Sequence, residues 1–306
     1  MKQDNSIVPQ VQLLKTLTGH QGSIYKLLAL PDGTLLSAGS EGIIAQWQPD
    51  QSDDASVFAK TPSPVYSMSL LDESSILAVG TGAGSIHFID TIGKQELKIL
   101  QLHKAQVFDL AISDSLNLGF SAGGDGQLAV FDTCTFNLIM IKQLYPGKIR
   151  KIKISNSGDR VAVAGGDETI RVFSLPDMEE ITVLKAHQGS ANALLWSNDD
   201  AYLWSGGRDA HIRIWDAKSY RAVREIPAHN YAIYDLMQLP QSEIVVSASR
   251  DKTVKFWNIE GEFLLRLNAE QFDGHKNSVN SINVCRDGQF ASAGDDRNIK
   301  LWNINV

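Results

Sequence analysis

The feature that most limits how this chain can fold is a repeat of 42 residues. A large apolar residue recurs at the end of a strand-like run, and the seven occurrences are Trp47, Ile89, Phe131, Phe173, Trp215, Trp257 and Trp302. Five successive intervals between them are 42 residues long, and the last is 45. Such regular spacing indicates seven copies of one supersecondary unit that packs against its neighbours.

Each unit has the pattern of short β-strands. Apolar residues alternate with polar or small ones in runs such as Ile212–Trp215 and Thr253–Trp257, which is typical of strands. Turn residues such as Pro31-Asp32-Gly33 separate these runs, and helical spacing is not sustained anywhere. Because 42 residues hold about four short strands, the sequence predicts an all-β fold, a seven-bladed β-propeller of four-stranded antiparallel blades.

A second pattern lies inside the units. Five of them carry a His 27 or 28 residues before the large apolar position, as in Ala186-His187 to Trp215-Asp216. Ser and Asp stand between the two at fixed offsets, as Ser205 and Asp209 do. On these residues the chain resembles the WD-repeat family, over nearly its whole length. In that family the innermost strand of each blade lines a central channel, and its start opens on the top face.

The resemblance also implies a role for the repeated polar residues. In WD repeats, His, Ser, Asp and Trp form a hydrogen-bonded chain, so that none of these polar groups is buried unpaired. The last three units carry the complete set: His187, Ser205, Asp209 and Trp215; His229, Ser247, Asp251 and Trp257; His275, Ser292, Asp296 and Trp302. The others depart from it, with Glu41 at the Asp position, Phe131 at the Trp position, Tyr145 with Val163, and Thr61 with Ile89. We expect the departing blades to rely on apolar packing instead.

A His–Ser–Asp set also suggests a hydrolase. A nucleophilic triad needs one copy, however, whereas this set recurs at the same spacing in three units. The repetition favours a structural role, so we predict that the protein has no catalytic residues and is not an enzyme.

The two ends of the chain predict how the ring closes. Too few residues follow Trp302 for a fourth strand, and an unassigned strand-like run, Val11–Leu17, precedes the first His. In the WD-repeat family the N-terminal strand completes the last blade, which leaves no open sheet edge. The resemblance thus implies that residues from about 10 to 17 complete the seventh blade. We expect residues 1–9 to form a flexible tail and residues 1–306 to form a single domain.

One position on the first strand of each unit is large and variable, although the residue before it is always apolar. By the resemblance this position faces a partner at the mouth of the channel. Tyr and Arg are enriched at binding hot spots, and aromatic side chains bury a large area. The alternative is that these side chains only plug the channel mouth. The predicted partner-binding residues are Tyr25, Tyr66, Phe108, Arg150, Asn192, Tyr234 and Asn280.

Charge and composition restrict the functions further. Lys and Arg number 28 and Asp and Glu 35, a net charge of −7, which disfavours a general nucleic-acid binder. No apolar run is long enough to span a bilayer or to act as a signal peptide. The two cysteines, Cys134 and Cys285, fit a reducing compartment. We expect a cytoplasmic protein that binds no membrane and no cofactor and is a monomer within larger assemblies.

The prediction that fits these features best is a non-enzymatic scaffold that binds a peptide or protein segment on the top face. One alternative is a hydrolase-like enzyme that uses the channel, which needs several inward carboxylates or histidines at one level. Another is a reader of acidic or phosphorylated segments through the basic fourth unit, where Arg can bind two oxygens at once. That unit contains Lys148, Arg150, Lys151 and Lys153.

No metal site is predicted. His87 and His211 stand at non-equivalent offsets. Asp109 and Asp235 belong to units three blades apart, so we expect that they do not converge on one ion. Arg208, Arg250 and Arg297 flank the turn acids of the last three units. They either extend the top face or pair with neighbouring side chains.

Overall fold

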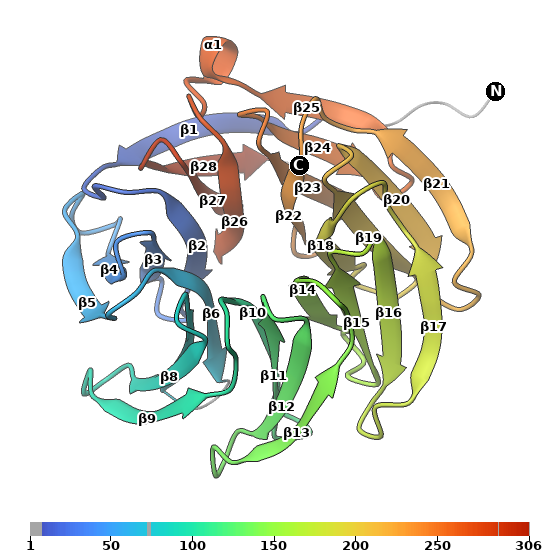
Figure 1. Ribbon diagram of the computed structural model, residues 1–306. Helices are drawn as coiled ribbons and strands as arrows, with labels where there is room; N and C mark the ends of the chain where they lie inside the picture. The colour runs from blue at the N-terminus through green and yellow to red at the C-terminus, as the bar shows by residue number, and fades with distance from the viewer. Residues whose placement is uncertain (1–7, 72–74, 287, 306) are drawn as a thin grey trace.

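The computed structural model describes residues 8–71, 75–286 and 288–305. Within these ranges the chain forms seven four-stranded antiparallel sheets arranged as the blades of a ring (Figure 1). The first strand of each blade lies next to the centre of the ring, and the fourth lies at its rim. The predicted seven-bladed propeller is confirmed.

The strands of the first four blades follow one another along the chain. Blade one contains β2 (Ile24–Ala29), β3 (Leu35–Gly39), β4 (Ile43–Trp47) and β5 (Ser56–Lys60). Blade two contains β6 (Val65–Leu71), β7 (Ile76–Thr81), β8 (Ser85–Asp90) and β9 (Glu96–Gln101). Blade three contains β10 (Val107–Ser113), β11 (Leu118–Gly123), β12 (Gln127–Asp132) and β13 (Leu138–Gln143). Blade four contains β14 (Ile149–Ile154), β15 (Arg160–Gly165), β16 (Thr169–Ser174) and β17 (Glu180–Lys185).

The remaining blades continue the same order until the last. Blade five contains β18 (Ala191–Trp196), β19 (Tyr202–Gly207), β20 (His211–Asp216) and β21 (Ala222–Pro227). Blade six contains β22 (Ile233–Gln238), β23 (Ile244–Ser249), β24 (Val254–Asn258) and β25 (Phe263–Leu267). Blade seven contains β26 (Val279–Arg286), β27 (Gln289–Gly294), β28 (Ile299–Asn305) and, at its rim, β1 (Gln10–Leu17).

The ring is closed by the N-terminal strand, as predicted. Strand β1 pairs antiparallel with β28, from Gln10 opposite Asn305 to Leu17 opposite Ile299, so the blue and red ends of the chain lie side by side (Figure 1). Leu17 is 1% exposed and packs in the core between blades seven and one. Residues 1–7 of the predicted tail lie outside the described residues.

One helical turn was not predicted. The short helix α1 (Ala269–Phe272) lies between β25 and β26, where Asn268 caps it by accepting a hydrogen bond from the backbone N–H of Gln271 (2.9 Å). It sits in the interval from Trp257 to Trp302, which is longer than the others. The extra residues of this interval are thus accommodated in a loop, and the 42-residue spacing of the strands is otherwise kept.

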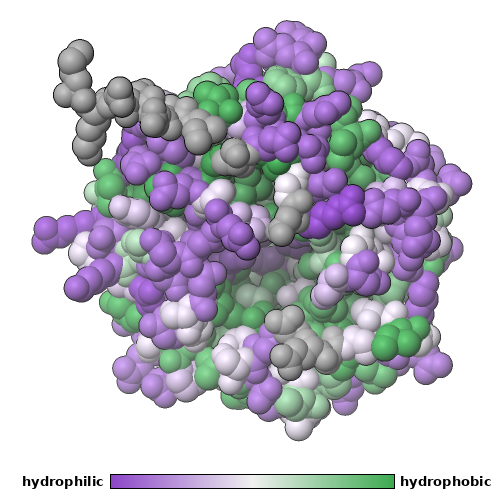
Figure 2. Space-filling view, turned by 180° about the vertical axis from the view of Figure 1, so that it is seen from behind, coloured by the Kyte–Doolittle hydropathy of each residue, from purple (hydrophilic) through white to green (hydrophobic). Residues whose placement is uncertain are grey.

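The core lies between neighbouring blades. Second strands such as β3 and β23 are buried along their whole length, whereas rim strands such as β9 and β13 are mostly exposed. Figure 2 shows the side opposite to that of Figure 1, hollowed at the middle of the ring and hydrophilic over much of its outer part. Among the described residues, no helix has the length and apolar character needed to cross a membrane.

Candidate functional site

The seven predicted partner-binding residues share one backbone feature. In blade one, Ile24 pairs with Gly39 and Lys26 pairs with Ala38, so Tyr25 is left as an unpaired bulge between them. The same shift leaves the equivalent residue unpaired in the other six blades, at Tyr66, Phe108, Arg150, Asn192, Tyr234 and Asn280. A bulge redirects the side chain that it carries. We call these seven residues the bulge ring.

The bulge ring lines a single depression at the mouth of the channel. All seven side chains contribute to its wall, and its volume is about 610 Å³. Each bulge residue is half-buried. The residues before them pack between the blades and have no exposed surface: Ile24, Val65, Val107, Ile149, Ala191, Ile233 and Val279. The structure therefore brings together side chains that lie up to 255 residues apart, from Tyr25 to Asn280.

One half of the depression is aromatic. Tyr25 stacks on Tyr66 with ring centroids 5.1 Å apart, and Tyr66 meets Phe108 edge to face at 5.4 Å. The guanidinium of Arg150 lies over the Phe108 ring, with its Cζ 4.6 Å from the centroid. These contacts hold the rings in place, so little further side-chain entropy is lost when a partner packs on them.

The other half is rich in arginine. Arg208 and Arg250 line the depression beside Arg150, whereas the only carboxylate among its described lining residues is Asp295. Asp295 accepts a hydrogen bond from Asn280 (2.8 Å). The Arg150 Nε atom is buried and has no hydrogen-bond partner within the described part of the chain. An unpaired buried donor is unfavourable, and an acceptor on a bound molecule would relieve it.

The sequence did not decide whether Arg208 and Arg250 extend the top face or pair with neighbouring side chains, although both stand at a position that recurs in every blade. Their backbone N–H groups donate to Ser190 and Ala232, in the loops that lead to the inner strands. The equivalent residue in blades two, three and four is glycine, at Gly82, Gly124 and Gly166. This position also recurs at the repeat spacing, and it makes the two sides of the depression different. The glycines leave room on the aromatic side, and the arginines fill the other side. Arg297 is not among the lining residues.

Below the bulge ring the channel holds a buried ionic cluster. Lys151 Nζ lies 3.3 Å from a carboxylate oxygen of Asp235 and 3.8 Å from one of Asp109. Burial opposes the charge of Lys151, but the two carboxylates outweigh it and raise the pKa of the ammonium. Burial likewise opposes ionisation of Asp235, but Lys151, Lys26 and the backbone N–H of Ile282 lower its pKa.

The structure shows two features of the channel that the sequence did not predict. Asp109 and Asp235, from units three blades apart, share one partner, because the long side chain of Lys151 reaches both. The basic run of the fourth unit is also not one patch. Lys151 belongs to the buried cluster, whereas Lys148 and Arg150 lie against Phe108 at the mouth. The bulge at Arg150 separates its side chain from that of Lys151, and the sequence run conceals this division.

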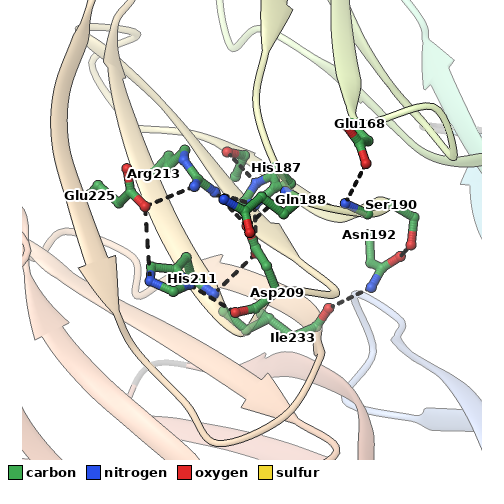
Figure 3. A network of polar contacts seen from close by, with 12 residues as sticks. Glu168, His187, Gln188, Ser190, Asn192, Asp209, His211, Arg213, Glu225 and Ile233 are labelled. Carbon is green, nitrogen blue, oxygen red and sulfur yellow. Dashed lines mark hydrogen bonds and ion pairs between the residues drawn. The ribbon is translucent and has the colours of Figure 1, made fainter.

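The repeated polar set forms the hydrogen-bonded chain that the resemblance implied in the last three units. In blade five, the Trp215 indole N–H donates to Ser205 Oγ (3.2 Å), which contacts His187 Nε2 (3.0 Å). His187 Nδ1 contacts Asp209 (2.9 Å; Figure 3). The corresponding distances are 2.9, 2.8 and 2.8 Å in blade six and 2.8, 2.8 and 3.0 Å in blade seven.

In blades five and six the charge of this hydrogen-bonded set resides on the acid. Burial lowers the pKa of His187, against the opposing effect of Asp209, so the imidazole is favoured in its neutral form. Burial opposes ionisation of Asp209, but hydrogen bonds from His187, the backbone of Gln188 and Arg213 hold its pKa well below the usual range. A neutral histidine that is held by an ionised acid suits a fixed structural link.

The expectation that the departing blades rely on apolar packing alone is wrong for blades one and three. In blade one, Glu41 reaches His20 Nδ1 at 2.7 Å, and Ser37 joins His20 to Trp47. A longer acid thus replaces Asp without loss of the chain. In blade three the indole is absent, but His103 still contacts Ser121 (2.8 Å) and Asp125 (3.1 Å).

Blades two and four use different hydrogen bonds. In blade four the Tyr145 hydroxyl donates to the Val163 carbonyl (2.9 Å), since no serine is present. Burial raises the pKa of Tyr145. In blade two, Thr61 Oγ1 donates to backbone carbonyls, and His87 contacts Ser85 Oγ (2.9 Å).

The serine of the His–Ser–Asp–Trp set allows a matched test of how much these hydrogen bonds stabilise a blade. Ser247 contacts both His229 and Trp257, whereas Ser121 contacts His103 alone. Both serines are fully buried. Since each orphaned buried group costs about 1–3 kcal/mol, we expect Ser247→Ala to lower the free energy of unfolding by about 2–3 kcal/mol and Ser121→Ala by roughly 1 kcal/mol less. Urea denaturation measures both, and a larger loss for Ser121→Ala would contradict this account.

Other chemistry-bearing groups were also located. Within residues 8–71, 75–286 and 288–305, no three His, Cys, Asp or Glu side chains gather where they could hold a metal ion. Cys134 is exposed and Cys285 is partly buried, and both are free thiols. Burial raises the pKa of Cys285 to about 12, which disfavours the reactive thiolate.

Comparison with known proteins is consistent with this geometry. The family model described as "WD domain, G-beta repeat" matches residues 11–48, 178–216, 220–258 and 268–303. These segments hold the blades in which a complete four-residue chain is present. Among solved structures, the WD40 β-propeller domain of Doa1 is similar over 96% of this chain and 97% of that chain, with a TM-score of 0.84 and 21% identity. Comparison with curated protein sequences gives no match.

Proposed function

Because this chain belongs to the WD-repeat family of seven-bladed β-propellers, we propose that it is a non-enzymatic scaffold that binds a protein segment at the mouth of its channel. Propellers of this family commonly serve as platforms for protein interactions. A fold alone does not define a function, so the proposal depends on the site.

The observation that carries the proposal is the depression lined by the whole bulge ring. Seven blades contribute one side chain each, and these side chains are four aromatic rings, two amides and one arginine. Soluble proteins rarely expose clustered aromatic side chains without a use. The volume of about 610 Å³ would accept the side chains of an inserted segment rather than a whole domain.

The arginines support a preference for an anionic group in that segment. Arg150, Arg208 and Arg250 line one side, and guanidinium groups bind carboxylate or phosphate through paired hydrogen bonds. An apolar side chain of the same segment would pack on Tyr25 and Tyr66 opposite. The reader of acidic segments is thus an extension of the scaffold proposal, carried by three blades instead of the fourth alone.

The proposal is tested by capture with matched variants. One variant carries Tyr66→Ala, Phe108→Ala and Arg150→Glu. Its control carries Ile181→Ala, Val183→Ala and Lys185→Glu on the rim strand β17, where all three side chains are exposed. We expect proteins captured from native lysate by the wild type and the control to be lost with the first variant.

Direct binding then decides the result. A captured protein, purified, should bind the channel-mouth variant at least tenfold more weakly than the control, since hot-spot residues each contribute about 2 kcal/mol. Both variants are first compared by thermal melting. Equal binding by the two variants would move the site away from the channel mouth, and a partner lost only with the control would place it on the rim.

A further inference from the structure

A second hollow lies on the rim, between blades five and six. It is a groove of about 730 Å³, within the size range of ligand sites. Its walls come from β21 of blade five and from β24 and β25 of blade six. The turn at Gly261 lines it, as does Gln271 of the unpredicted helical turn. No residue of the bulge ring contributes to it.

The floor of the groove is apolar. Trp257 and Ile226 are buried there, and Phe263 stands over the floor with 56% of its surface exposed. The rings of Trp257 and Phe263 meet edge to face, with centroids 5.7 Å apart. A large aromatic ring that is fixed on one side and open on the other is a typical anchor for an apolar side chain.

The walls of the groove carry three cations without matching acids. They are Arg224, Lys255 and Arg266, and none of the described lining residues is Asp or Glu. The Arg224 and Lys255 side chains donate to the carbonyls of Glu260 (2.7 Å) and Ala228 (2.6 Å). In the described part of the chain none of the three cations is within ion-pair distance of a carboxylate.

Two of these cations lie directly opposite each other. Lys255 of β24 pairs in register with Arg266 of β25. Burial and the charge of Arg266 lower the pKa of Lys255, against the opposing effect of Asp251. Like charges at facing positions destabilise a sheet, so the fold alone gives no reason for this pair.

Blade five shows how the same position is arranged without a groove. Arg213 stands two residues before Trp215, as Lys255 stands two residues before Trp257. Its cross-strand partner is Glu225, and the two side chains form an ion pair at 2.8 Å (Figure 3). In blade five the cation on the third strand thus faces an acid on the rim strand. In blade six the residue that faces Lys255 is a second cation, Arg266.

We propose that the groove between blades five and six is a second docking site, for an acidic segment of a partner protein that carries a large apolar side chain between its carboxylates. The apolar side chain packs on Phe263 and the floor, and the carboxylates pair with Lys255 and Arg266. The apolar floor distinguishes such a segment from nucleic acid. The site is independent of the channel mouth.

Random dodecapeptides displayed on phage, selected on the intact chain, test this site. We expect one class of enriched peptides to carry at least two Asp or Glu residues beside Leu, Ile or Phe. Synthesised with a fluorescein label, these peptides should bind at least tenfold more weakly to the Arg266→Glu variant than to the wild type. This substitution places a carboxylate opposite Lys255, just as Glu225 lies opposite Arg213. Binding should also weaken when NaCl is raised and when the acids are changed to amides.

The controls separate this site from the channel mouth. Lys185→Glu places the same charge change on another rim strand and should leave binding unchanged, as should the channel-mouth triple variant. Phe263→Ala should weaken binding at least threefold, and the melting temperature of Arg266→Glu should not fall. The proposal is overturned if no acidic–apolar class is enriched, if that class ignores Arg266→Glu, or if it is lost with the channel-mouth variant. The proposal would also be overturned if a thymidylate dodecamer bound as tightly as the acidic–apolar peptides.

Discussion

Removal of the chain up to Leu17 is expected to abolish the stable ring. Without β1, blade seven keeps three strands, and β28 becomes an open edge. Seven residue pairs between β1 and β28 are lost, including the contact of Leu13 with buried Trp302. Burial of Leu17 alone contributes about 1.5–3 kcal/mol, and the whole strand contributes a large part of the roughly 5–15 kcal/mol that stabilises a protein.

Thermal melting and size-exclusion chromatography measure the effect. We expect the melting temperature to fall by more than about 10 °C, or the transition to lose cooperativity, and an open edge favours aggregation. A circular permutant provides the control. Since Gln10 lies opposite Asn305, a short Asn-Gly turn can join β1 after β28 as a hairpin. The permutant should melt near the wild type. A truncated chain that melts like the full one would show that β1 does not close the ring.

Lys151→Met is expected to have the second large effect. The substitution leaves Asp109 and Asp235, which are 5% and 7% exposed, without the ammonium between them. Removal of one partner from a buried ionic group costs about 3–5 kcal/mol. Lys26 and Lys153 lie close enough to influence the cluster, so we expect about 3 kcal/mol in urea denaturation. Lys185→Met, on the exposed rim, should have almost no effect.

The neighbouring acids make this prediction specific. Changing Asp109 and Asp235 to Asn in the Lys151→Met background removes the charges that Lys151→Met leaves unpaired. Most of the lost free energy of unfolding should then be recovered. The pH dependence has a defined sign. Without Lys151 the burial that opposes ionisation of Asp235 is less well balanced and the pKa of Asp235 rises, so the deficit is largest at neutral pH and shrinks as the pH falls. A deficit that is independent of pH and is not recovered would indicate lost packing instead.

The fold could be predicted from the sequence because its information is repeated. The spacing from Trp47 to Trp257 places the third strand of each of the first six blades. The strand-like run Val11–Leu17, together with the resemblance to WD repeats, places β1 within a residue of its observed bounds. The helix Ala269–Phe272 was missed because four residues are too few to show helical periodicity.

The site was only partly predictable. The bulge ring was found because its residues recur at a fixed offset, but the bulge itself depends on pairing between strands and has no local pattern. Arg208 and Arg250 were ambiguous because each adjoins an acid in the chain, and only the fold shows that they line the depression. The buried role of Lys151 was missed because its partners are 42 and 84 residues away.

The pairing of β1 with β28 also bears on the order in which the protein folds. Gln10 and Asn305 are 295 residues apart, and closing so long a loop costs roughly 5 kcal/mol of chain entropy. During synthesis β1 emerges before the other strands of the ring, and β28 emerges after them. Blades one to six can form from strands that are close in sequence. Until β28 is available, β1 has no partner strand and its apolar residues are exposed. We therefore expect ring closure to be the last and slowest step of folding, and the chain to be most open to aggregation or chaperone binding just before it.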